Sequence, residues 1–427
     1  MTDGAKTPHR FAGALAGVAL ALAVSGCAVS SPPATSSSGP SESFGPTATL
    51  QPSPSPSPTL EQTPATPSST PLQPPPPGSW TASVSMANPR YDHTATRLLD
   101  GRVLVVGGCC LNRALLAPAE LYDPDTDFWI ATGSMATPRW MHTATLLRDG
   151  RVLVTGGVTG GGTTVLSSAE LYDPDSGVWS ATPSMGRPRA QHTATLMADG
   201  RVLVAGGESG LGLLASAELY DPDSGTWSAT GNLRAPGWLR SATLLPDGRV
   251  LLAAGEGGSG LLGAELYDPD TGVWTPTGNL VTPRVQHTAT LLSDGRVLVA
   301  GGYTNGGGGL LASAELYDPD SGTWAPSGSL VTARSGHTST LLSDGTVLVV
   351  GGAGSRHFEL VASAERYDPG SGTWTAAGVL ITPRGDHTAT LLLDGTVIVA
   401  GGNAYDAGAT SLRRASIGEL YDPDGGT

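Results

Sequence analysis

Six histidines each follow an arginine by three residues, and the pairs recur along most of this chain. The histidines are His93, His142, His192, His287, His337 and His387. Imidazole is a common metal ligand, but a metal ion needs its ligands about 2 Å away. Side chains that lie one structural repeat apart cannot share one ion, so we interpret these histidines as hydrogen-bonding groups of the fold. We predict no metal and no cofactor.

Aspartates form a second recurring pattern, as Asp-Gly pairs and as strings such as Asp318-Pro319-Asp320-Ser321-Gly322. Carboxylate oxygens are good calcium ligands, so specific calcium sites are one interpretation of these strings. A calcium loop of the helix–loop–helix type needs a bidentate glutamate farther along, and here an aromatic segment follows. Aspartate side-chain capping and the fixed φ of proline explain a turn without metal. We therefore predict structural turns.

The residues that vary between repeats are the candidates for ligand recognition. They lie between the arginine and the histidine, or just after a pair of glycines, and in the fourth repeat Gly237 and Arg240 replace the arginine and the histidine. The predicted ligand-binding residues are Tyr91, Asp92, Trp140, Gln191, Glu208, Trp238, Arg240, Glu256, Gln286 and Tyr303, with Asn403, Tyr405 and Asp406 nearby. Aromatic rings, carboxylates and amides suit a carbohydrate, and they also suit a basic peptide. The alternatives are tolerated drift of the repeat and packing of each aromatic against its neighbour.

The elements that position these residues repeat with a period near 50. Seven tryptophans mark the period at spacings of 47 to 50, namely Trp80, Trp129, Trp179, Trp227, Trp274, Trp324 and Trp374. One unit runs from Pro283 to Trp324 and reads as four short strands. Asp294-Gly295 predicts a hairpin with a primed turn, in which both residues adopt positive φ. The paired glycines Gly301-Gly302 predict a close approach of two backbones.

The order of residues in each repeat resembles the kelch repeat over residues 79 to 427: arginine and histidine come first, then Gly-Gly, then tyrosine, then tryptophan. The resemblance implies an all-β fold, a seven-bladed β-propeller with four-stranded antiparallel blades. The last repeat stops before its tryptophan, whereas the first segment, around Trp80, is an outer strand with no unit before it. We therefore expect the N-terminal strand to complete the seventh blade and close the ring.

The same resemblance brings in one enzyme class, because kelch propellers include a copper radical oxidase branch that resembles galactose oxidase. That branch needs a cysteine-linked tyrosine, a second tyrosine and two histidine ligands, and no complete set can be assigned here. Cys109 and Cys110 can form a vicinal disulfide or remain thiols, and neither state specifies a reaction. A serine elbow, a phosphate loop and a zinc cluster are also missing from the sequence. We predict that the chain is not an enzyme and keep the oxidase as the alternative.

The first residues have the form of an export signal. An apolar run from Phe11 to Val24 follows basic residues and ends at Cys27, in a sequence that closely resembles the lipobox of bacterial lipoproteins. The resemblance implies cleavage before Cys27 and lipidation of its sulfur; the alternative is ordinary secretion. We divide the chain into a signal peptide (1–26), a Pro/Ser/Thr-rich tether (27–78) and a propeller (79–427).

The net charge of the chain excludes one class of binding partner. The chain carries a formal charge of −14 with a single lysine, so a phosphate backbone would be repelled and nucleic acid is an unsuitable partner. We predict a propeller that is held at the extracytoplasmic face of a bacterial membrane by its lipid anchor alone. There it binds a carbohydrate or an extracellular protein.

Overall fold

The computed structural model describes residues 78–109, 115–257, 263–304, 309–354, 359–405 and 412–425. The chain divides into Met1–Thr70 and Pro71–Thr427, and all described residues belong to the second unit. Their regular elements are all β-strands, as predicted. Within these ranges no helix has the length and apolarity needed to cross a membrane. Cys27 and the rest of the predicted signal peptide and tether, up to residue 77, lie outside the described residues.

The strands form seven four-stranded antiparallel sheets, here called sheets 1 to 7 in the order of their innermost strands. Sheet 1 contains β2 (Thr94–Arg97), β3 (Val103–Val106), β4 (Pro118–Asp123) and β5 (Phe128–Ser134). Sheet 2 contains β6 (Thr143–Leu146), β7 (Val152–Thr155), β10 (Ala169–Asp173) and β11 (Val178–Thr182). Sheet 3 contains β12 (Thr193–Leu196), β13 (Val202–Ala205), β14 (Ala217–Asp221) and β15 (Thr226–Ala229). Sheet 4 contains β16 (Ser241–Leu244), β17 (Val250–Ala253), β18 (Ala264–Asp268) and β19 (Val273–Pro276). Sheet 5 contains β20 (Thr288–Leu291), β21 (Val297–Ala300), β24 (Ala314–Asp318) and β25 (Thr323–Pro326). Sheet 6 contains β26 (Thr338–Leu341), β27 (Val347–Val350), β28 (Ser363–Asp368) and β29 (Thr373–Val379). Sheet 7 contains β31 (Thr388–Leu391), β32 (Val397–Ala400), β35 (Ile417–Asp422) and β1 (Ser79–Ser85).

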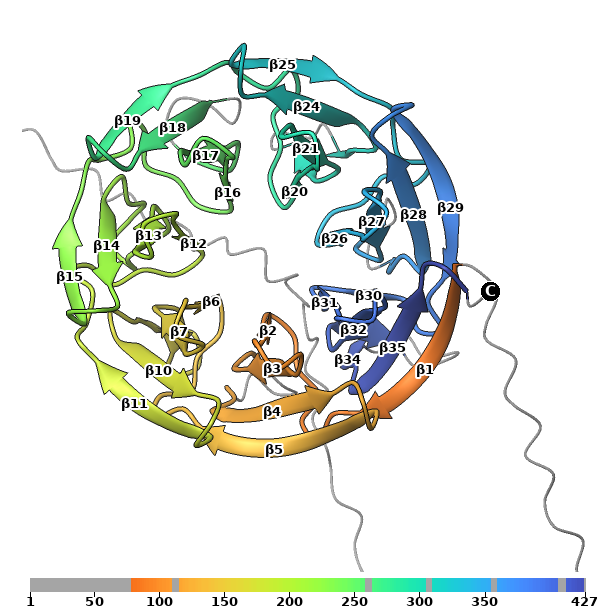
Figure 1. The fold of residues 1–427 in the computed structure, drawn as a ribbon, viewed down its shortest axis with the longest axis horizontal. Coiled ribbons are helices and arrows are strands. Elements are labelled where there is room, and N and C mark those ends of the chain that lie inside the picture. Colours follow the sequence, from red (N-terminus) through yellow and green to blue (C-terminus); the bar gives the residue numbers. More distant parts are fainter. Residues whose placement is uncertain are drawn as a thin grey trace, which may run out of the picture. The chain divides into compact units, whose positions relative to one another are not determined.

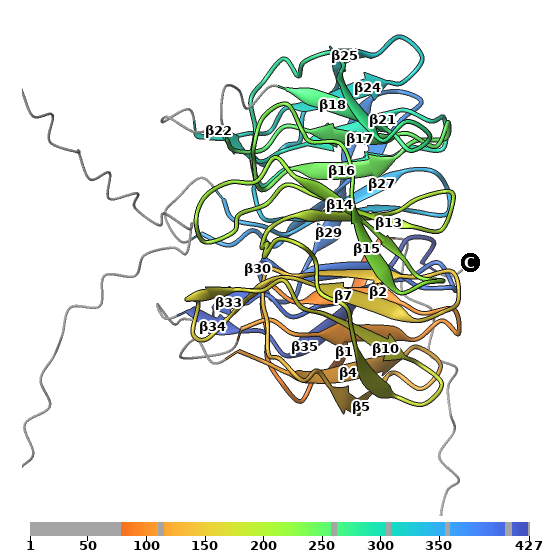
Figure 2. The same cartoon turned by 90° about the vertical axis from the view of Figure 1, so that its left-hand side faces the viewer.

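The sheets follow one another around a central axis, with the first strand of each repeat innermost (Figure 1). Sheet 7 joins the two ends of the unit, because β1 pairs antiparallel with β35, where Trp80 lies opposite Tyr421. The innermost strands β2 and β31 are also in contact. Short ribbons follow the paired glycines: β8 (Val158–Thr159) with β9 (Thr164–Val165), β22 (Tyr303–Thr304) with β23 (Gly309–Leu310), and β30 (Arg384–Gly385) with β33 (Asn403–Tyr405) and β34 (Leu412–Arg414). Figure 2 shows β22, β33 and β34 on the same side of the unit.

Burial along the strands matches the sequence pattern. The second strand of each sheet, such as β21, is buried at four consecutive positions, as expected for a strand that is covered on both faces. The outermost strand, such as β25, is exposed except at its tryptophan, which is half-buried. Tyrosine and tryptophan on the two outer strands pack against each other in every sheet, with tilted rings whose centroids lie 5.0 or 5.1 Å apart.

The Asp-Gly hairpins differ from the primed turn that the sequence predicted. Only the glycine has positive φ, which is 87° at Gly295, and Asp294 does not. The loop is longer than two residues, since Leu292 N–H donates to Arg296 O (2.8 Å) and Gly295 N–H donates to Leu292 O (3.0 Å). The Asp294 carboxylate accepts the N–H of Arg296 (3.1 Å), so the aspartate stabilises the turn through its side chain rather than through its backbone conformation.

The Asp-Pro strings are turns of the kind predicted. The Asp318 carboxylate accepts the N–H of Asp320 (2.9 Å) and the hydroxyl of Ser321 (2.9 Å). These hydrogen bonds lower the pKa of Asp318, because they favour its charged form. Among the described residues no three histidine, cysteine or acidic side chains are grouped as metal ligands would be.

The paired glycines lie where two backbones come close together, as the sequence predicted. Gly301 and Gly302 have φ of 63° and 90°. A Cβ added at Gly301 would lie 2.6 Å from the His337 ring of the next sheet, and one at Gly302 would lie 2.6 Å from Val285 O. Only glycine fits both the conformation and the space.

Buried arginines tie the first loop of each repeat to its third strand. In six sheets a guanidinium with no exposed surface contacts a glutamate at 2.5 to 2.7 Å; the pairs are Arg90–Glu120, Arg139–Glu170, Arg189–Glu218, Arg284–Glu315, Arg334–Glu365 and Arg384–Glu419. The glutamate also accepts backbone N–H groups, for example those of Ala136 and Thr137 on Glu170. Each pair therefore has further hydrogen bonds that offset the cost of burying two charges.

The six repeated histidines connect neighbouring sheets, and their predicted hydrogen-bonding role is confirmed. Each Nε2 contacts a hydroxyl at the start of the preceding innermost strand, at 2.9 to 3.1 Å; the pairs are His93–Thr388, His142–Thr94, His192–Thr143, His287–Ser241, His337–Thr288 and His387–Thr338. Burial lowers the pKa of all six, so the rings are neutral at physiological pH.

Candidate functional site

The residue just before each repeated histidine, or before Arg240 in sheet 4, has a left-handed backbone. These seven residues, here called the rim, have φ between 50° and 60° and are Asp92, Met141, Gln191, Leu239, Gln286, Gly336 and Asp386. Positive φ is uncommon outside glycine, and holding it costs on the order of 1–3 kcal/mol per residue. The surrounding sheets therefore impose the turn, and the sequence did not reveal it.

Rim residues of neighbouring sheets touch through their backbones. Gln191 N–H donates to Met141 O (3.1 Å), and Asp386 N–H donates to Gly336 O (3.0 Å). Each rim residue lies two positions before an innermost strand, so the rim encircles one end of those strands. Three predicted site residues lie on the rim, Asp92, Gln191 and Gln286, and they belong to sheets 1, 3 and 5, so they are not neighbours.

Two carboxylates occupy adjacent rim positions where sheet 7 meets sheet 1. Burial raises the pKa of Asp92 well above its ordinary value, and the neighbouring charge of Asp386 raises it further. Burial also raises the pKa of Asp386, although a hydrogen bond from Asn403 Nδ2 (2.8 Å) opposes that change. The Arg414 guanidinium lowers both pKa values, but burial has the larger effect on each. Arg414 therefore balances only part of the negative charge of the Asp92 and Asp386 carboxylates.

Arg414 links the carboxylates to an aromatic group. Its Nη1 donates to Asn403 Oδ1 (2.5 Å), and its guanidinium carbon lies 4.0 Å from the centre of the Tyr91 ring. Tyr91 meets Trp140 edge to face, with centroids 6.1 Å apart. The indole N–H of Trp140 is buried and has no hydrogen-bond partner. We call Tyr91, Asp92, Trp140, Asp386 and Arg414 the 7/1 cluster.

The remaining predicted residues lie around sheets 3 to 5 and do not join this cluster. Backbone bridges pair Ala190 with Glu208, Trp238 with Glu256, and Val285 with Tyr303. Burial raises the pKa of Glu208, whereas the pKa of Tyr303 is raised by burial and also by the Glu256 charge. Trp238 is only 9% exposed, so little of its ring is available to a ligand.

Arg240 has a structural partner that accounts for its position. Its guanidinium lies 3.6 Å from Glu265, and its Nη2 donates to Ala235 O (3.2 Å). A Cβ added at Gly237 would lie 2.4 Å from Arg240 Nε. The side chain therefore fills the space that the absent arginine leaves, and we do not include it in the 7/1 cluster. Gln191 is also engaged, since its Nε2 contacts Met141 Sδ (3.0 Å).

Sequence reasoning missed Arg414 and gave Asp386 no role. The available signal was Arg413-Arg414, because the other repeats carry no arginine at these two positions before the third strand. Asp406 and Cys110 lie outside the described residues, and Cys109 is buried.

The residues present do not fit the copper centre of the oxidase branch. The six repeated histidines direct Nε2 to hydroxyls of neighbouring strands, and their Nδ1 atoms are buried. No described acidic, cysteine or histidine side chains are grouped as three or more ligands. We therefore derive no chemical step through copper.

Four-stranded antiparallel sheets that pack side by side around an axis define the β-propeller class. Comparison with known proteins is more specific: the Kelch motif matches residues 141–186, 188–234 and 284–330. Three of the repeats are therefore kelch motifs.

Among solved structures, a fungal alcohol oxidase of the AA5 family in complex with copper is similar, with a TM-score of 0.67. It is 20% identical, and the likeness covers 81% of this chain and 76% of the oxidase. None of the curated proteins compared with the chain matches it.

The oxidase corrects one prediction from the sequence. We expected that the chain is not an enzyme, and the similarity to a copper alcohol oxidase contradicts that expectation. Identity of this order shows the fold alone, so it does not assign a reaction to this chain. The fold is compatible with catalysis and gave no ground for excluding it.

Proposed function

We propose that this chain is a seven-bladed kelch propeller that binds an extracellular protein through a basic side chain, which the 7/1 cluster receives. The observation that carries the proposal is the pair of half-buried carboxylates, Asp92 and Asp386, whose pKa values are both raised. A guanidinium or ammonium group placed between them would relieve their repulsion. Tyr91 and Trp140 would cover the apolar stem of that side chain.

A closed ring is part of the proposal. It is supported by the pairing of β1 with β35, by the His93–Thr388 hydrogen bond and by a buried cluster that joins Val103 and Val105 to Ile398. The ring matters to function because Asp92 and Asp386 come from the first and last repeats. Without closure the two carboxylates would not be neighbours.

A direct test uses the fluorescein-labelled peptide Gly-Gly-Arg-Gly-Gly and the same peptide with citrulline, which keeps the shape of arginine and removes its charge. We expect the arginine peptide to bind better, and Asp92→Asn and Asp386→Asn each to weaken it about tenfold, the cost of losing one charge-assisted hydrogen bond. Asp270→Asn is the matched control, because it removes one negative charge from an exposed turn. Equal binding of both peptides, or equal losses in all three variants, would refute the proposal.

Carbohydrate is the second candidate, and the half-buried Tyr91–Trp140 pair favours it. Aromatic faces pack on sugar rings, and the amides of Gln191 and Gln286 suit hydroxyl groups. A glycan array separates the two candidates: selective glycan retention that Trp140→Ala abolishes, together with indifference to peptide charge, would favour carbohydrate.

We also propose that Cys27 carries a lipid and holds the propeller at the extracytoplasmic face of a bacterial membrane. The support is the lipobox-like sequence before Cys27. Cys27→Ala should move the protein from the membrane fraction to the soluble fraction, and continued retention in membranes would contradict the anchor.

A further inference from the structure

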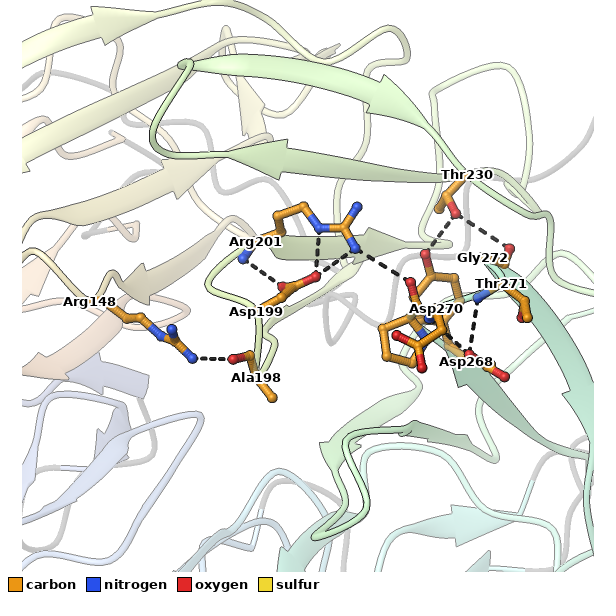
Figure 3. A network of polar contacts seen from close by, with 11 residues as sticks. Arg148, Ala198, Asp199, Arg201, Thr230, Asp268, Asp270, Thr271 and Gly272 are labelled. Carbon is orange, nitrogen blue, oxygen red and sulfur yellow. Dashed lines mark hydrogen bonds and ion pairs between the residues drawn. The ribbon is translucent and has the colours of Figure 1, made fainter.

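Arginines connect neighbouring sheets on the side of the molecule that carries the Asp-Gly hairpins. In sheets 1 to 5 an arginine follows the Asp-Gly pair and contacts the hairpin aspartate at 2.6 Å; the pairs are Arg102–Asp100, Arg151–Asp149, Arg201–Asp199, Arg249–Asp247 and Arg296–Asp294. Three of these arginines also donate to a proline carbonyl in the Asp-Pro turn of the next sheet, at 3.3 to 3.4 Å; the bonds are Arg102–Pro174, Arg201–Pro269 and Arg296–Pro369. Figure 3 shows Arg201 between Asp199 and the turn that contains Asp268 and Asp270.

Sheet 6 reaches the same arrangement with a different residue. Thr346 follows its Asp-Gly pair, and the guanidinium comes instead from Arg366 on β28. Arg366 pairs with the hairpin aspartate, Asp344, and donates to Pro423 O of sheet 7 (3.5 Å). Each of sheets 1 to 6 therefore places a guanidinium on its hairpin aspartate, whichever strand supplies it.

Sheet 7 supplies no arginine to its junction with sheet 1. Thr396 follows its Asp-Gly pair, and Leu420 occupies the position that Arg366 has in sheet 6. The hairpin aspartate, Asp394, accepts the N–H and the hydroxyl of Thr396 through Oδ1 (2.9 and 2.8 Å). Its carboxylate therefore stabilises the turn as in the other sheets, but without a cation beside it.

A second carboxylate faces this junction from sheet 1. Asp127 stands where the Asp-Pro turns of sheets 2 to 6 end in glycine, and it keeps their left-handed backbone (φ 49°). Its Oδ1 accepts the hydroxyls of Tyr122 (3.0 Å) and Ser83 (2.5 Å). Burial raises the pKa of Tyr122, and the charges of Asp127 and Asp394 raise it further, so both carboxylates lie near its hydroxyl.

The corresponding tyrosines of other sheets have a cation nearby. At three of them the charge of an arginine opposes the rise in pKa that burial causes; the pairs are Tyr172–Arg102, Tyr317–Arg249 and Tyr421–Arg366. At the junction of sheets 7 and 1, Arg97 reaches across but donates to Leu391 O (2.9 Å). Neither Asp127 nor Asp394 forms an ion pair with a described residue. Asp394 is exposed and Asp127 is half-buried, so a partner can reach this pair of carboxylates.

We propose that Asp394 and Asp127 receive the guanidinium of an arginine from a protein partner. The occupant is indicated by sheets 1 to 6, where the corresponding aspartates hold a guanidinium that the chain itself supplies. The planar guanidinium can bond the Asp394 carboxylate and Pro124 O together, as Arg201 bonds Asp199 and Pro269 O.

A metal ion is less suitable than a guanidinium at this place. The described residues contain no group of three acidic, histidine or cysteine side chains that could hold one. The inference rests on the closed ring of the proposed function, because Asp394 and Asp127 come from the last and first repeats. It does not use the 7/1 cluster, whose residues lie at the other end of the innermost strands.

The test is a titration of the full chain with N-acetyl-L-arginine methylamide, followed by saturation-transfer NMR. The protein carries Asp92→Asn and Asp386→Asn, which disable the 7/1 cluster. We expect this compound to bind better than its lysine analogue, which keeps the charge, and its citrulline analogue, which keeps the shape. Asp394→Asn should weaken binding about fivefold, the loss expected for a partly exposed charge pair. Asp247→Asn is the matched control, because Arg249 already pairs with this hairpin aspartate, and it should leave binding unchanged.

An arginine supplied by the chain itself gives a second measurement. Thr396→Arg should pair with Asp394 and abolish binding, while the melting temperature stays equal or rises, which separates lost binding from unfolding. Thr346→Arg is the matched control, because Arg366 already pairs with Asp344, and it should leave binding unchanged.

Three results would overturn the proposal. They are equal binding of the arginine and lysine compounds, unchanged binding in Asp394→Asn or Thr396→Arg, and a calcium-induced rise in melting temperature that Asp394→Asn removes, which would indicate a metal site instead. Failure of the proposed function would appear elsewhere, in the Asp92→Asn and Asp386→Asn single variants of the peptide assay.

Discussion

Acid should destabilise this propeller through its buried histidines. Burial lowers the pKa of His142, His287 and His387 to about 3, and their ordinary value is about 6.5. Between these values the unfolded chain binds protons that the folded chain does not. Stability is therefore complete above pH 6.5 and is lost as the pH falls toward 3.

The loss of folding stability can be calculated for one histidine. Each pH unit below 6.5 costs about 1.4 kcal/mol per histidine, so at pH 5.0 one ring costs about 2 kcal/mol. Three such rings cost about 6 kcal/mol, which is comparable with the whole stability of an ordinary domain. Asp92 and Asp386 act in the opposite direction, because a raised pKa in the folded state stabilises it at low pH.

The contribution of one histidine to the pH dependence can be separated from that of the other groups by comparing wild type with a variant that lacks it. Urea unfolding, followed by tryptophan fluorescence, is measured at pH 7.5 and pH 5.0 for wild type and for His142→Gln. We expect the difference in unfolding free energy between the two pH values to shrink by about 2 kcal/mol in the variant. Thr94→Val is the control, since it removes the hydroxyl bonded to His142 and leaves the buried ring. It should lower stability at both pH values and retain the pH dependence.

The reasoning fails if His142→Gln has the same pH dependence as wild type. That result would mean that the ring is protonated equally in the folded and unfolded chains.

Three further perturbations test the fold. Deleting residues 79–86 should lower the melting temperature sharply, because sheet 7 would lose its outer strand; an unchanged temperature would count against closure by β1. Tyr172→Phe should cost about 1 kcal/mol in urea unfolding, because it loses the bond to Thr132; an unchanged unfolding free energy would contradict this partner assignment. Arg139→Met should cost about 3–5 kcal/mol by leaving Glu170 buried without its cation, and a loss below about 1 kcal/mol would show that the glutamate is solvated.

The sequence was sufficient to predict most of the strands, because their determinants lie within one repeat. Hydrophobic strands such as β21, the glycines that follow it and the Asp-Pro turns depend on residues a few positions apart. The hydrogen-bonding role of the histidines also followed, since each recurred with the same neighbours. The turn type at Asp294-Gly295 was wrong because the carboxylate bonds Arg296 and makes a longer loop stable.

The 7/1 cluster could be predicted only in part, because it joins the first and last repeats. Tyr91, Asp92 and Trp140 were identified by their variation, whereas the contact of Asp92 with Asp386 depends on how the sheets are arranged. Arg414 lies in an irregular ribbon whose register no period determines.

The hydrogen bonds between imidazoles and hydroxyls also indicate where the molecule opens first. They connect every pair of adjacent sheets except sheets 3 and 4, where Arg240 stands in place of histidine and Thr193 bonds Ala205 O in its own sheet. Opening between sheets 3 and 4 breaks no bond between an imidazole and a hydroxyl, whereas opening any other junction breaks at least one. Amide hydrogens of β12 and β16 should therefore exchange with solvent sooner than those of the other innermost strands, and a partner that spreads the ring would do so between these two strands.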